Sequence, residues 1–143
     1  MRNILNMSYR SFAAGYNYSA ASNPRVFMDV SNNGAGAGRL VFELFENHAP
    51  ANATNFAAFC NGTASGHRAL AGTSLGQGLS GFGVHGGFLG GENVGAADER
   101  VADEDLHVRH HKRGMLTMLN DGPHSNGSQF LVTFGEAHYL DGY

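Results

Sequence analysis

Several residue types are scarce in this sequence, which has one cysteine, no tryptophan, three prolines and only 15% charged residues among its 143. Because Cys60 has no partner for an internal disulfide, it predicts a reducing intracellular compartment, in the first place the cytoplasm. No apolar run approaches the roughly 20 residues of a membrane-spanning helix, so we expect no membrane span. The net charge of -3, without an extended basic patch, argues against a nucleic-acid partner.

Hydrophobic residues make up 42% of the chain, which predicts a folded globular protein rather than a disordered one. A length of 143 residues allows one domain with one core. Glycine is abundant, with 21 residues, and many of them lie between Gly72 and Gly95. Hydrophobic periodicity is too weak in that stretch to place the ends of any strand.

Residues 1–23 are expected to form an N-terminal extension that precedes the domain. The segment contains Arg2 and Arg10, and no acidic residue precedes Asp29, a bias typical of mitochondrial transit peptides. Two interpretations stay open. One is a targeting segment, which makes a mitochondrial location the alternative to the cytoplasm. The other is an uncleaved extension that packs on a partner.

The hydrophobic pattern after the extension predicts short strands and one helix. Residues 25–30 and 39–45 alternate as strands, and the turn-rich residues 31–36 between them predict a hairpin. Pro50 suits the first turn of a helix over 51–60, which the Asn61-Gly62 pair ends. Further strands are expected over residues 114–119 and 128–134, and the glycine-rich stretch can supply short strands such as 79–84, although their ends are not defined. This pattern favours a mainly antiparallel sheet or barrel.

Three histidines, His107, His110 and His111, have the i, i+3 and i, i+4 spacing that can bind zinc on a helix. No cysteine or helical pattern accompanies them, and the basic residues 109–113 directly follow the acidic residues 103–105. We therefore expect a solvated surface loop here, and neither a metal nor another cofactor.

Two motifs near the end of the chain are the most specific features of the sequence. The run DGPHSNGSQFLVTF over residues 121–134 is followed by Tyr139-Leu140-Asp141-Gly142. Together with Asn55-Phe56 and residues 38–45, these motifs resemble the cyclophilin family of peptidyl-prolyl cis-trans isomerases. The resemblance runs from about Asn23 to Gly142. It implies a cyclophilin-like domain over 24–143, a mainly β fold in which an antiparallel β-barrel carries a capping helix.

The resemblance also implies a site in which a proline side chain enters an apolar pocket beside a polar groove. At three of the implied pocket positions the side chain is smaller here than in the family. Gly83 stands in place of a methionine, Leu131 in place of a phenylalanine, and Tyr139 in place of a tryptophan. His85 replaces a groove glutamine. The substrate-binding residues that the resemblance implies are Phe82, His85, Leu119, Asn120, Gln129, Leu131, Tyr139 and Leu140.

The catalytic position is degenerate, because Gln77 stands where the resemblance implies an arginine. A cation with rigid donors can stabilise the lone pair that develops on the proline nitrogen as the amide twists. A neutral amide offers a weaker hydrogen bond. We therefore predict a proline-peptide-binding or scaffold subunit with weak or absent isomerase activity, a pseudoenzyme. The alternative is an active isomerase that assists protein folding.

The family continues beyond Gly142 with a further strand, a helix and a closing strand, so the last strands and helix of the family are absent from this chain. The resemblance then implies a barrel with an open seam. Either the sequence is partial, or a neighbouring chain fills the seam by strand addition. The second interpretation predicts neighbouring subunits in a larger complex as partners, in addition to a proline-containing peptide or protein segment.

Overall fold

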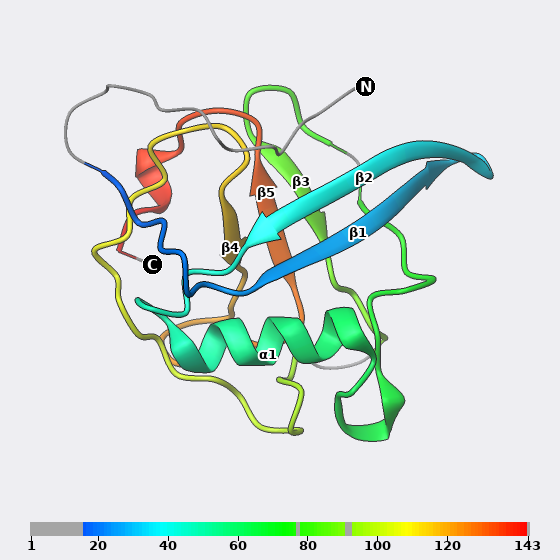
Figure 1. The fold of residues 1–143 in the computed structure, drawn as a ribbon, viewed down its shortest axis with the longest axis horizontal. Helices are drawn as coiled ribbons and strands as arrows, with labels where there is room; N and C mark the ends of the chain where they lie inside the picture. Colours follow the sequence, from blue (N-terminus) through cyan, green and yellow to red (C-terminus); the bar gives the residue numbers. More distant parts are fainter. Residues whose placement is uncertain (1–15, 77, 91–92, 143) are drawn as a thin grey trace.

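The structure of this protein is a computed structural model that describes residues 16–76, 78–90 and 93–142. Strands and a single α-helix form the described part (Figure 1). The elements in chain order are β1 (Arg25–Asn32), β2 (Ala35–Glu43), α1 (Pro50–Asn61), β3 (Gly83–Gly86), β4 (Leu116–Met118) and β5 (Phe130–Thr133), with 3-10 turns at Ser65–His67 and His138–Leu140.

Strands β1 and β2 form the expected antiparallel hairpin. Its turn is tighter than the sequence suggests, because Asn32 already pairs with Ala35. Asn33 and Gly34 both have positive φ, 50° and 79°, as a two-residue hairpin turn requires. The prediction of a second strand over 39–45 is therefore wrong at its start. Glycine and alanine at 35–38 give little strand signal, yet they continue the pairing.

Strands β3, β5 and β4 form a second antiparallel sheet in which β5 is central. The predicted strands over 114–119 and 128–134 are confirmed in shorter form as β4 and β5. The predicted strand over 79–84 is largely a turn, since Leu79 makes only an isolated bridge to Gly83. Gly81 between them has a φ of 77°, which reverses the chain before β3 begins.

Helix α1 packs against strands of both sheets and forms the core with them (Figure 1). As expected, Pro50 occupies its first turn, and Gly62 ends it in the left-handed region with a φ of 68°. The ring of Phe56 meets Phe130 of β5 edge to face, with centroids 5.3 Å apart. Cys60 packs against this core, and burial raises the pKa of its thiol to about 11, which disfavours the nucleophilic thiolate.

Among the described residues the two sheets are not hydrogen-bonded to each other, so they do not form a closed barrel. The mainly β architecture with one covering helix agrees with the expected fold class. No helix in the described ranges is long and apolar enough to cross a membrane.

The end of the expected N-terminal extension packs on the domain. Asn23 and Ser19 both donate hydrogen bonds to the carboxylate of Glu43, at 2.9 Å and 2.8 Å. The ring of Tyr18 lies against Phe45 and edge-on to His48. Residues 1–15, which carry Arg2 and Arg10, lie outside the described residues.

Candidate functional site

The sheet of β3, β5 and β4 has one face toward the core and one away from it. Phe130 and Val132 of β5 belong to the core, so the alternating residues Leu131 and Thr133 point to the opposite face. Cross-strand pairing places His85 of β3 and Thr117 of β4 on either side of Leu131. We call this opposite face, with His85, Leu131, Thr117 and Thr133, the groove face.

The segment before β3 runs along the outer edge of that strand. The main-chain N–H groups of Gly76 and Leu79 donate to the carbonyls of His85 and Gly83, at 2.8 Å and 3.0 Å. The His85 imidazole packs directly on the backbone of Gly76, and a Cβ at position 76 would overlap the ring. Gln77, the degenerate catalytic position, lies outside the described residues.

An aromatic pair stands at one end of the groove face. The rings of Phe82 and Tyr139 are stacked, with centroids 6.1 Å apart and an interplanar angle of 20°. Tyr139 is 58% exposed on the turn His138–Leu140, which also carries Leu140. The carbonyl of Phe82 accepts a hydrogen bond from the N–H of Phe134, the residue that follows β5. The end of β5 therefore holds the main chain of Phe82 in position.

Leu131 lies on the same face of the sheet as Gly83 and is only 1% exposed. A Cβ at Gly83 would lie 3.0 Å from Cδ1 of Leu131 and closer still to the carbonyl of Val132. Leu131 therefore occupies space beside the position for which the resemblance implies a methionine. A longer side chain at 83 fits only if the leucine or the strand moves.

A polar cluster stands at the other end of β4 and β5. The buried amide of Asn93 donates to the carbonyl of Leu119 at 2.8 Å and accepts from the N–H groups of Ser128 and Gln129 at 2.8 Å and 3.0 Å. Leu119 in turn donates to the carbonyl of Gln129 at 2.9 Å. Asn93 could not be predicted from the sequence, because a lone asparagine in a glycine-rich stretch forms no pattern.

Asn120 is engaged by its own loop. Its amide donates to Oδ1 of Asn126 at 3.2 Å and accepts from the N–H of Gly122 at 3.3 Å. The structure thus brings together three pairs of the predicted site residues: Phe82 with Tyr139, His85 with Leu131, and Leu119 with Gln129. The side chain of Asn120 instead forms hydrogen bonds within the turn that precedes Asn126.

The basic segment 109–113 departs from the expected solvated turn. The side chain of His110 is only 11% exposed, and its ring donates a hydrogen bond to the Asp141 carboxylate at 2.9 Å. Asp141 itself is 4% exposed and also accepts the main-chain N–H of His110 at 2.7 Å. The described residues contain no group of three His, Cys, Asp or Glu side chains placed to hold a metal ion.

The family of the chain follows from a comparison with protein-family models. The model described as "Cyclophilin type peptidyl-prolyl cis-trans isomerase/CLD" matches residues 27–143. The chain therefore belongs to the cyclophilin-type peptidyl-prolyl cis-trans isomerase family, as its motifs and its mainly β fold indicate. Membership supports a cyclophilin-like, proline-binding function. The assignment of individual residues to the groove stays a prediction.

Proposed function

We propose that this chain is a cyclophilin-like subunit that binds proline-containing peptide segments, has weak or absent isomerase activity and serves in a larger assembly. One observation carries the proposal: none of the nine residues assigned to the site has a permanent positive charge. Gln77 stands at the position for which family resemblance implies an arginine.

The chemistry explains why the loss of this charge matters. Rotation about the X–Pro amide faces a barrier of about 18–20 kcal/mol, because the C–N bond has partial double-bond character. A catalyst must bind the twisted amide more tightly than either planar form. Removal of a preorganised donor to a developing charge typically lowers a rate by about 10²–10³. A glutamine amide leaves little of that stabilisation.

Binding depends on other features, and these are present on the groove face. Proline-rich segments dock on aromatic-lined grooves, and Phe82 and Tyr139 form a partly exposed aromatic pair. Leu131 lies on the same face but is almost fully buried. A leucine in place of a phenylalanine offers less surface to a proline ring, which lowers affinity by about 25 cal/mol for each Å² lost.

The test is an isomerisation assay by NMR exchange on a tetrapeptide with a central Ala-Pro bond. We expect the wild-type chain to leave the exchange close to its uncatalysed rate, which takes tens to hundreds of seconds. Gln77→Arg should raise the rate by at least about tenfold, a part of what a preorganised donor supplies. The matched control is Ser80→Arg, which adds the same charge to the same loop and should change nothing.

Binding is measured on the same samples by titration of the peptide into labelled protein. Signals of residues next to Phe82 and Tyr139 should shift, and Tyr139→Ala should weaken the titration. A wild-type rate well above the uncatalysed rate and equal to that of Gln77→Arg would instead establish an active isomerase. Absence of any peptide-induced shift would sink the proposal in favour of a purely structural subunit.

A further inference from the structure

His85 is the exposed member of the groove face. It is exposed and Thr117 is half-buried, whereas Leu131 and Thr133 are each only 1% exposed. The imidazole ring lies at the outer edge of β3, because it packs on the backbone of Gly76. A ligand that lies across this face therefore meets the ring of His85 directly.

The elements around this ring contain no other charged residue. Strands β3, β4 and β5 have no Asp, Glu, Lys or Arg in their sequences, and neither has the segment 73–82 that runs along β3. Near the aromatic pair, His138 and Asp141 contact each other at 3.0 Å. Glu92, in the loop after β3, lies outside the described residues. On the described groove face, His85 is therefore the only side chain of a type that changes its charge near neutral pH.

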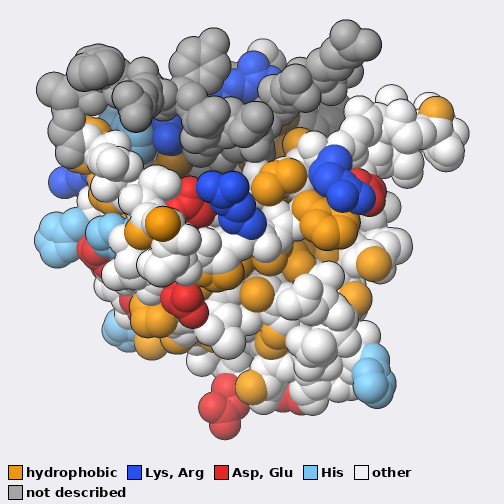
Figure 2. Space-filling model, viewed as in Figure 1, with side chains coloured by type: hydrophobic (Ala, Val, Ile, Leu, Met, Phe, Trp, Pro, Cys, Tyr) orange, Lys and Arg blue, Asp and Glu red, His pale blue; other side chains and the backbone are white. Residues whose placement is uncertain are grey.

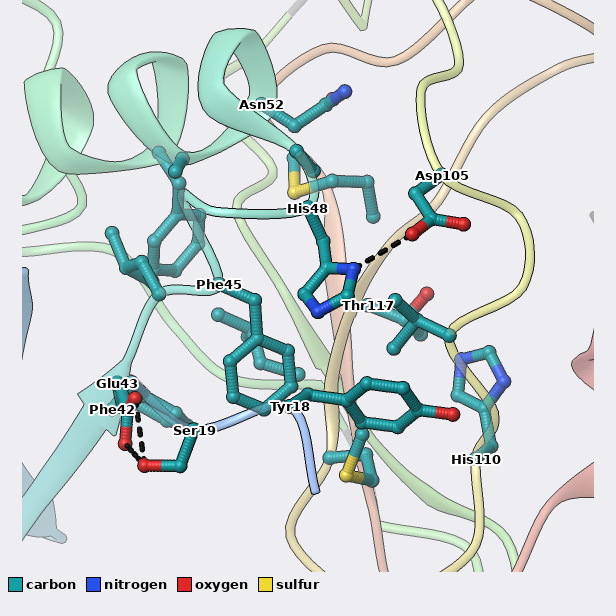
Figure 3. Close-up of a pocket in the computed structure, with 18 of the residues that line it drawn as sticks. Tyr18, Ser19, Phe42, Glu43, Phe45, His48, Asn52, Asp105, His110 and Thr117 are labelled. Atoms are coloured by element: carbon teal, nitrogen blue, oxygen red, sulfur yellow. Dashed lines mark hydrogen bonds and ion pairs between the residues drawn. The ribbon is translucent and has the colours of Figure 1, made fainter. Parts of the chain in front are cut away.

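Most other histidines of this protein already contact a carboxylate. Five of them have a ring nitrogen within 3.5 Å of an Asp side-chain oxygen: His48, His107, His110, His124 and His138. Figure 2 shows histidine and acidic side chains next to one another on the left of the molecule, and Figure 3 shows one such contact, between His48 and Asp105 at 2.7 Å. Within residues 16–76, 78–90 and 93–142, the ring of His85 contacts no carboxylate. A carboxylate supplied by a ligand would give His85 the partner that these five histidines have.

The position of His85 relative to the aromatic pair sets the spacing that such a ligand needs. Phe82 and Tyr139 are the proposed place of the proline ring, and His85 lies three residues beyond Phe82 along the chain. Three residues of extended strand span about 10 Å. An extended peptide that runs along β3 thus brings a side chain about three residues from its proline to the imidazole.

We propose that His85 makes the groove selective for proline peptides that carry an acidic side chain about three residues from the proline. The inference rests on the proposed function, since it names the class of peptide that the groove prefers. The protonated imidazole donates a hydrogen bond to the carboxylate and attracts its charge. Selectivity for acidic peptides therefore increases as the pH falls and the histidine takes up a proton.

The test compares blocked peptides that contain one proline and differ at a single residue, titrated into the labelled whole chain and followed by NMR. Aspartate stands three residues before the proline in one peptide and three residues after it in another. Asparagine replaces it in the matched neutral peptides. Titrations are run at about pH 5.5 and about pH 8, toward the two ends of the range in which a histidine ordinarily changes charge.

At the lower pH, at least one aspartate peptide should bind about threefold more tightly than its asparagine counterpart, which is the size expected of an exposed ion pair. At the higher pH the two should bind equally. The difference should also disappear in about 1 M salt, because salt screens the attraction between exposed charges.

His85→Gln is the decisive variant, because it keeps a polar side chain and removes the titratable charge. The aspartate and asparagine peptides should then bind this variant equally at both pH values. His67→Gln is the matched control, since His67 is exposed on the turn that follows α1 and lies outside the groove face. This control should retain the full difference between the peptides. Unfolding curves of both variants show whether each remains folded.

Three results would overturn the proposal while the asparagine peptides still bind. Neither aspartate peptide gains affinity at the lower pH, the gain persists in His85→Gln, or the gain survives high salt. In each case the selectivity is absent or has another cause, and the groove itself stands. If no peptide of the set binds at either pH, the proposed function fails, and this inference fails with it.

Discussion

At the scale of single residues, the carboxylate of Asp141 holds the C-terminal turn against the basic segment. It accepts hydrogen bonds from the main chain of His110 and, at 3.0 Å, from the His138 ring. Burial alone would raise the pKa of Asp141, but the hydrogen bonds from His110 and His138 hold it well below its usual range. The ionised form is therefore favoured in the folded protein.

Asp141→Asn is expected to lower the free energy of unfolding at pH 7 by about 1.5–3 kcal/mol, because hydrogen bonds to a buried charge are lost. Urea denaturation measures the change. The control is Asp121→Asn, at a carboxylate whose side chain is 69% exposed and should contribute little. An equal effect of the two substitutions would contradict this assignment.

The same shift predicts a pH dependence with a definite sign. A carboxyl whose folded pKa is depressed stabilises the fold above its unfolded pKa and loses that contribution as pH falls. Asp141 has an ordinary value of 3.8, so wild-type stability should decline as the solution is acidified from about pH 5. Urea midpoints from pH 7 to pH 3 should fall less steeply for Asp141→Asn than for the wild type. Parallel curves would show that Asp141 does not cause the decline.

At the scale of elements, helix α1 is capped by a residue far along the chain. Its N-cap residue Ala49 makes no side-chain hydrogen bond, and its first turn contains no acid. The carboxylate of Glu104 instead accepts from the N–H groups of Ala51 and Asn52, at 3.0 Å and 2.9 Å. It satisfies two free donors and places a negative charge at the positive end of the helix dipole.

Glu104→Ala should therefore lower the free energy of unfolding by about 1–2 kcal/mol, the range found for the loss of an N-cap. Thermal unfolding followed by circular dichroism measures it. Glu99→Ala removes an exposed acid from the preceding loop and serves as the control. If both variants melt together with the wild type, Glu104 does not cap the helix.

At the scale of the whole molecule, buried asparagines connect segments that are distant in sequence. Asn55 of α1 donates to the carbonyl of Gly127 at 2.8 Å and accepts from the N–H of Ala96 at 2.6 Å. Asn93 joins Leu119 to Ser128 and Gln129. The side-chain amides of Asn55 and Asn93 thus connect helix α1 and the second sheet to the glycine-rich stretch by hydrogen bonds. Asn93 thereby positions two of the predicted groove residues.

Asn93→Ala should lower the free energy of unfolding by about 1–3 kcal/mol, because buried main-chain groups lose their partner. It should also weaken binding of the Ala-Pro tetrapeptide under conditions in which the variant is fully folded. Asn93→Asp, which keeps the acceptor for Ser128 and Gln129, should restore part of the affinity. Asn61→Ala, at the exposed end of α1, is the control. Unchanged affinity in folded Asn93→Ala would leave Asn93 a purely structural role.

The sequence predicted the elements whose signals are local. Pro50 and Gly62 mark the ends of α1, and alternation marks the hairpin. The motif over 121–134 identified the family. The features that the sequence did not predict depend on contacts between residues that are far apart along the chain. His110 beside basic residues looks solvated, since its partner Asp141 lies 31 positions away. Glycines between 72 and 95 carry no conformational preference from which their path follows.

The contact of the His85 ring with the backbone of Gly76 couples the residues that these two positions can accept. No side chain fits at position 76 while His85 keeps its place. A substitution of Gly76 is therefore expected to be tolerated only when residue 85 is replaced by a smaller residue or moves. The effects of substitutions at the two positions should not be additive.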